Sequence, residues 1–217
     1  MQRHTSNRIA AWLFVAAALM VWGGWMLLPH QIGTFFEADD FAAVDARLTL
    51  WIWMFRLYLF GLVTAVLALV ALGAVLEDSD ARVLLWPGVA VAAAGLLVMA
   101  LAGAFYYHFG AWGAISQRAR SPEEVAAFAS SLEVATEYIT CLVRFGRVFF
   151  GLGQVVLVAG LLADRRLPRW VALSGAVLGV AAMALTMGLP DDLDLYRPIF
   201  HLDVAWLAAV GWRLFRL

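Results

Sequence analysis

The sequence predicts an all-α, polytopic membrane protein: one domain, residues 1–217, folded as a six-transmembrane-helix bundle with both termini in the cytoplasm. Three observations support this prediction. The chain is 64% hydrophobic and only 14% charged. It contains six apolar runs of about 20 residues or more, the length that crosses ~30 Å of hydrocarbon. All six prolines open a predicted helix or follow the end of one, the positions where a helix tolerates proline.

Each run has its own local signals. The first follows the basic start MQRHTSNR, but it is longer than a signal-peptide core and no small-x-small cleavage site follows it, so we expect a retained helix. The second contains Arg56. Pro87, Pro168 and Pro198 stand near the starts of the third, fifth and sixth runs. Before the fourth run, Ser121 and the segment PEE predict a short surface helix that leads into the membrane. The runs cover residues 9–28, 49–76, 85–108, 134–163, 169–189 and 197–216.

The distribution of arginine predicts the orientation. With a cytoplasmic N-terminus, eight arginines lie in inner segments and four in outer ones, as the positive-inside rule requires. Together with an all-arginine, alanine-rich composition that fits a high-GC bacterium, this orientation leads us to expect a multi-pass protein of a bacterial inner membrane. The inner set is Arg3, Arg8, Arg82, Arg165, Arg166, Arg169, Arg213 and Arg216, and the outer set is Arg47, Arg118, Arg120 and Arg197.

The fourth run carries a polar stripe. Its polar and small residues are separated by alternating steps of four and three, which places them on one helical face. An arginine that faces lipid at mid-membrane costs on the order of 3 kcal/mol even on insertion scales, so we expect this face to turn into the bundle. The stripe comprises Glu133, Glu137, Thr140, Arg144, Arg147, Gly151 and Gln154.

Polar residues of other runs gather in the same outer half of the predicted bundle. The formal charge count of this region is three intramembrane arginines against two acids, Glu137 and Asp203, so one positive charge has no counterpart. Because guanidinium groups bind carboxylates and phosphates through two parallel hydrogen bonds, the sequence predicts a pocket for an anionic amphiphile or a membrane lipid headgroup. The expected ligand-binding residues are Arg56, Arg144, Arg147, Glu137, Tyr107, His108, His201 and Asp203.

Two other hypotheses fit the same residues. The charges could pair internally, in an accessory or structural subunit that binds a membrane-protein partner or forms a homo-oligomer. Alternatively, His30, His108 and His201 could ligate a metal or a haem in a membrane electron carrier. No nucleophile, base and orienting group can be assembled from spacing, so the sequence assigns no catalytic residue and does not decide whether the protein is an enzyme.

The composition also excludes some functions. All fifteen basic residues are arginine, so no lysine is present to form a Schiff base. The net charge of -1 implies neither a nucleic-acid partner nor an acidic one. Gly175 and Gly179, four residues apart, predict close helix packing within the chain.

The C-terminal third carries a resemblance. The segments FGRVFFGLGQVVLVAG and GLLADRRLPRWVALSGAVLGVAAMALT combine an apolar helix, a short basic turn and a helix of small residues. This pattern resembles the same region of small bacterial multi-pass membrane proteins classed as domains of unknown function. The resemblance implies a compact helical membrane domain and assigns no catalytic residue.

Overall fold

A computed structural model describes residues 2–27, 36–77, 81–189 and 193–217. Within these ranges the regular structure consists of helices alone. The fold class predicted from the sequence is therefore confirmed at the level of a helical protein with apolar, membrane-length helices. The helices are α1 (Gln2–Met26), α2 (Ala38–Ala46), α3 (Leu48–Val75), α4 (Arg82–Gln117), α5 (Pro122–Asp164), α6 (Arg169–Gly188) and α7 (Leu193–Leu214).

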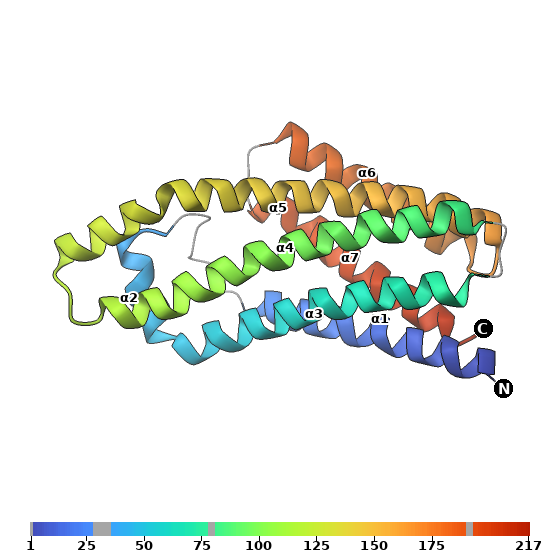
Figure 1. Ribbon diagram of the computed structural model, residues 1–217, viewed down its shortest axis with the longest axis horizontal. Coiled ribbons are helices and arrows are strands. Elements are labelled where there is room, and N and C mark those ends of the chain that lie inside the picture. The colour runs from blue at the N-terminus through green and yellow to red at the C-terminus, as the bar shows by residue number, and fades with distance from the viewer. Residues whose placement is uncertain (1, 28–35, 78–80, 190–192) are drawn as a thin grey trace.

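The six long helices form a closed ring. Each packs against the long helix before it and the long helix after it in the chain, and α7 packs against α1 to complete the circle. Among the described residues, the backbones of long helices that are not neighbours in the ring stay apart. Figure 1 shows the long helices side by side, with both chain ends at one end of the molecule. A ring of this kind leaves a central space that side chains fill or line.

Glycines let neighbouring helices approach closely. A Cβ at Gly153 of α5 would lie 2.2 Å from the backbone nitrogen of Ala92 on α4. Gly179 of α6 faces Gly151 of α5, and Gly175 of α6 faces the indole of Trp206 on α7. The predicted use of Gly175 and Gly179 for packing within the chain is confirmed.

Two helices extend beyond the rest of the ring. With 36 and 43 residues, α4 and α5 are about 54 Å and 65 Å long, well over the ~30 Å of hydrocarbon. Figure 1 shows them projecting as a hairpin, with α2 packed beside it, at the end away from the chain termini. We call this part the cap: α2, residues 105–117 of α4 and residues 122–136 of α5.

The cap has its own hydrophobic cluster, in which Phe41 and Val44 of α2 pack with Ala111, Ala114 and Leu132. The helix predicted at Ser121 begins there with its expected cap, but it is not a separate surface helix: it is continuous with the fourth run, so α5 is a single helix. The segment before the second run contains the helix α2, which hydropathy did not predict.

Five helices are long and apolar enough to cross a membrane: α1, α3, α4, α5 and α6. They match the first five predicted runs, which shows a multi-pass membrane protein. The sixth run corresponds to α7, a 22-residue helix that is not among these five and that packs against α1 and α6.

Candidate functional site

The polar stripe of α5 passes from the surface of the cap into the ring. Glu137 is exposed, Thr140 and Arg144 are half-buried, and Arg147 and Gln154 are buried. The change accompanies the packing of α5, which contacts α2, α4 and α6. Near the inner end of the stripe, Gly151 faces Gly179 of α6. The inner half of the stripe therefore supplies the polar groups of the ring interior.

Arg147 is only 5% exposed and lies over an aromatic ring. Its Cζ is 4.1 Å from the centroid of Tyr196 on α7. A cation over an aromatic face is attracted by the ring quadrupole, and this attraction grows when both groups are shielded from water. Tyr196 thus offsets part of the cost of placing a guanidinium inside the ring.

A second contact joins the same two helices one heptad further on. Gln154, fully buried, donates a hydrogen bond from Nε2 to Oδ1 of Asp203 at 3.0 Å. Asp203 is 6% exposed. Seven residues separate Arg147 from Gln154, and seven separate Tyr196 from Asp203, which is about 10 Å of rise along each helix. We call the two contacts the upper rung (Arg147–Tyr196) and the lower rung (Gln154–Asp203).

Three residues of the rungs, Arg147, Tyr196 and Asp203, line a central cavity of about 140 Å³. Each of α1, α3, α4, α5 and α7 contributes one face to its lining. Most of the lining is apolar, and Arg147 and Asp203 are its charged residues. The aromatic lining residues are Trp25, Trp51, Phe55, Tyr58, Tyr106, Phe150, Tyr196 and Phe200.

Aromatic contacts organise this lining. Trp25 of α1 stacks on Phe200 of α7 with centroids 4.4 Å apart, and Trp51 lies 4.8 Å from Phe55 on α3. The hydroxyl groups of Tyr106 and Thr140 are 3.4 Å apart on the cap side of the cavity. The cavity thus offers ring faces on its walls and a few polar groups.

Arg144 binds the C-terminal end of the neighbouring helix, α6. Its Nη2 donates to the carbonyl oxygen of Thr186 at 2.6 Å, and the carbonyl of Leu189 is 3.5 Å away. These carbonyls belong to the C-terminal end of α6, where backbone acceptors have no partner within the helix and a positive charge is favourable. Arg144 therefore caps α6 and does not line the cavity.

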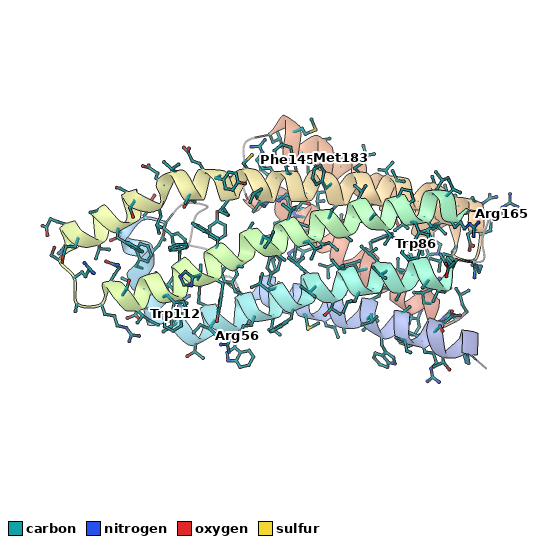
Figure 2. The ribbon with its side chains drawn as sticks, in the orientation of Figure 1. Arg56, Trp86, Trp112, Phe145, Arg165 and Met183 are labelled. Carbon is teal, nitrogen blue, oxygen red and sulfur yellow. The ribbon has the colours of Figure 1, made fainter. Side chains whose placement is uncertain are left out.

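Arg56 lies on the outside of the ring. It is exposed, and its Cζ is 5.5 Å from the ring centroid of Trp53, one turn earlier on α3. Figure 2 shows it at the outer edge of α3. The expected convergence of guanidinium groups from two spans does not occur, because Arg56 is two residues before the lining residue Tyr58 and so points to the opposite face. The charged lining residues are one arginine and one aspartate, which removes the expected excess of positive charge.

The other expected site residues are scattered. Tyr107 packs in the cap, with its centroid 6.5 Å from Phe55. His108 is exposed beside Phe109, and Glu137 is exposed on α5. His201 is half-buried next to Phe200.

The metal or haem hypothesis requires the histidines to meet. His108 on α4 and His201 on α7 belong to helices that are not neighbours in the ring, and His30 lies outside the described residues. Among the residues that the structure describes, no group of three or more His, Cys, Asp or Glu side chains could hold a metal ion.

Sequence reasoning did not identify Tyr196 and Tyr58 as site residues, nor the partnership of Gln154 with Asp203. The sequence did contain a pattern that could have indicated these contacts, because Arg147 and Gln154 have the same spacing as Tyr196 and Asp203. Equal seven-residue spacings on two helices that run in the same direction predict two matched contacts.

Comparison with known proteins adds no functional assignment. The resemblance of the C-terminal third to small bacterial membrane proteins stays a prediction. No family model, no curated protein sequence and no solved structure matches this chain.

Proposed function

We propose that the protein is a six-span inner-membrane protein whose central cavity binds a membrane amphiphile, with the polar end of the ligand at Arg147. The observation that carries this proposal is a cavity walled mainly by apolar and aromatic side chains, with a buried arginine in its lining. An amphiphile has both parts that such a cavity recognises: an apolar body and an oxygen-bearing head.

Ring closure supports α7 as the sixth span. Its 22 residues are about 33 Å long, and it packs along α1, which is itself long and apolar enough to cross. Six spans place both termini on the same side. The arginine bias favours the cytoplasm for that side, and Arg213 over Trp170 and Arg216 over Trp212 are pairs typical of a membrane interface.

The position of the membrane then sets the depth of the cavity. Arg56 and Trp53 suit the opposite interface, and Arg56 is about 29 Å along α3 from Val75, close to the thickness of the hydrocarbon layer. The cap lies beyond that interface, on the periplasmic side. Arg147 and Tyr196 would therefore lie near the outer leaflet, within reach of the head of an amphiphile.

The polar head of the ligand would contribute more to selectivity among amphiphiles than its apolar part. Moving a methylene group from water into an apolar site gains about 0.8 kcal/mol, but an amphiphile that comes from the bilayer has already gained this. A hydrogen bond to a charged group contributes about 1.5–3 kcal/mol. Since the lining contains Asp203 as well as Arg147, a formal charge count no longer requires the anionic head that the sequence suggested.

Native mass spectrometry of the gently solubilised full chain tests the proposal. We expect a co-purified amphiphile on the natural protein, retained in Arg56→Gln and lost in Arg147→Gln. Val143→Phe, which enlarges a side chain of the cavity lining, should also lose it. A natural protein without any adduct, or equal adducts in all four proteins, would contradict the proposal. The same spectra report the number of chains and bound partners, which tests the alternative of an accessory subunit.

A further inference from the structure

One buried hydrogen-bond donor on the cavity wall has no partner among the described residues. Trp51 of α3 is only 2% exposed, and it lines the cavity. Its indole Nε1 makes no hydrogen bond within the part of the chain that the structure describes. A buried N–H without a partner is costly, and buried indoles usually have one. This donor is therefore available to a group that occupies the cavity.

Trp206 of α7 shows what a satisfied buried indole looks like in the same protein. It is 3% exposed, and its Nε1 donates to the carbonyl oxygen of Val171 at 2.8 Å. Several buried side-chain atoms of the described residues lack a hydrogen bond, and among these atoms Nε1 of Trp51 is the one that belongs to the cavity lining. The open donor thus coincides with the cavity.

The nitrogen lies toward the cap end of the cavity. Trp51 is the lining residue of α3 that is nearest the cap. A Cβ at Gly110 of α4 would lie 2.4 Å from Nε1, and Gly110 is one turn nearer the cap than the lining residue Tyr106. Because glycine has no side chain, residue 110 leaves the nitrogen uncovered. In the proposed orientation this end faces the outer leaflet, where the head of an amphiphile would lie.

Trp51 and Arg147 place the same requirement on a ligand. Both side chains carry N–H donors and no acceptor, and both line the cavity. Asp203, the acidic residue of the lining, already accepts from Gln154. A head that offers acceptor oxygens can bond to such donors. An ammonium head brings only further donors, and a plain hydrocarbon brings neither.

From these observations we infer that Trp51 is a specificity-determining residue of the cavity, whose Nε1 donates a hydrogen bond to an acceptor oxygen in the head of the bound amphiphile. The inference rests on the proposed function, because it concerns the ligand of the same cavity. It adds the chemistry by which the cavity distinguishes an oxygen-bearing amphiphile from a hydrocarbon or a cationic amphiphile.

Two one-ring probes of the same shape test this inference. Acetophenone carries a carbonyl oxygen, and α-methylstyrene has a methylene group in its place. An apolar cavity of about 150 Å³ in another protein binds benzene, so both probes suit a cavity of about 140 Å³. Isothermal titration calorimetry of the full chain in detergent measures the dissociation constant of each probe.

Trp51→Phe keeps an aromatic side chain and removes the N–H. We expect it to raise the dissociation constant of acetophenone roughly three- to ten-fold more than that of α-methylstyrene, because only the ketone loses a hydrogen bond. Since each probe is compared with itself, its partition into the micelles cancels. Trp53→Phe, on the exposed face of α3, is the matched control and should change neither constant. Val143→Phe should weaken both probes, because it reduces the space in the cavity.

The indole signals of the natural protein give a second measurement. In the NMR spectrum of protein with ¹⁵N-labelled tryptophan, the indole signal that Trp51→Phe removes belongs to Trp51. Acetophenone should move the N–H proton of Trp51 farther downfield than α-methylstyrene does, as formation of a hydrogen bond requires. The signal of Trp206, which already donates to Val171, should stay in place with both probes.

The outcomes separate the two proposals. If Trp51→Phe affects the two probes equally, or if both probes shift the Trp51 signal equally, the inference about Trp51 fails while amphiphile binding stands. This is the result that a buried water on Nε1 would give. If neither probe binds, or if Val143→Phe weakens neither, the cavity takes up no ligand and the amphiphile proposal fails as well.

Discussion

Gln154 donates to the carboxylate of Asp203 at 3.0 Å across a ring in which their helices, α5 and α7, are not neighbours. One heptad nearer the cap, Arg147 reaches the ring of Tyr196 on the same α7. Long side chains thus join two helices whose backbones stay apart. This separation is compatible with the cavity beside the rungs.

The lower rung should contribute measurably to stability. Gln154→Leu removes the donor and leaves a buried carboxylate with one hydrogen bond fewer, which we expect to cost about 1–3 kcal/mol. The double variant Gln154→Leu, Asp203→Leu replaces both partners by apolar groups and should recover most of this loss. Unfolding in mixed detergent micelles measures both values, and a double variant no more stable than the single one would contradict this account.

The α4–α5 contact should not tolerate one added methyl group. A Cβ at Gly153 would lie 2.2 Å from the backbone of Ala92, so Gly153→Ala should lower the free energy of unfolding by about 1–3 kcal/mol. Gly23→Ala is the matched control, because no atom lies within 4 Å of the added Cβ. That change should raise stability by about 0.5–1 kcal/mol through helix propensity. Equal effects at the two positions would refute the contact.

Arg144 should protect the end of α6 from opening. Arg144→Met removes the donor to the carbonyl of Thr186, and we expect the last turn of α6 to exchange its amide hydrogens faster. The rest of α6 should keep its exchange rates. Arg56→Met removes an arginine that contacts Trp53 instead, so it should leave α6 unaffected. Hydrogen exchange with mass spectrometry resolves these segments, and unchanged exchange in Arg144→Met would show that the cap is dispensable.

The orientation predicts which end of the molecule reagents reach. In a Cys141→Ser background, Ala126→Cys places a thiol on the exposed surface of the cap, and Arg165→Cys places one at the opposite end. A maleimide that does not cross membranes should label the first variant in intact cells and the second only after lysis. The reverse pattern would place both termini outside.

Hydropathy predicted the membrane-length helices but not their full lengths. The third and fourth runs were expected at 85–108 and 134–163, whereas α4 continues to Gln117 and α5 begins at Pro122. The length of an apolar run indicates only the part of a helix that lies in lipid. Both of these helices extend beyond their apolar runs. The helix α2 is too short to give an apolar run, although Phe41 and Val44 share one buried face.

The site was predicted only in part for a related reason. The stripe on α5 has a polar face and an apolar face, so its inward direction could be read, and Arg147 is buried as expected. The helix α3 is apolar on all sides apart from Arg56, so hydropathy gives no inward direction there. Arg56 follows Trp53 by one turn, a spacing that could have indicated the exposed pair.

The closed ring also has a consequence for biosynthesis. Arg147 and Gln154 each precede their partners on α7 by 49 residues of chain. At ribosomal rates of roughly 5–20 residues per second, several seconds pass between the synthesis of these side chains on α5 and that of their partners. The two contacts across the ring therefore form only after α7 has been made, which places closure of the ring at the end of synthesis.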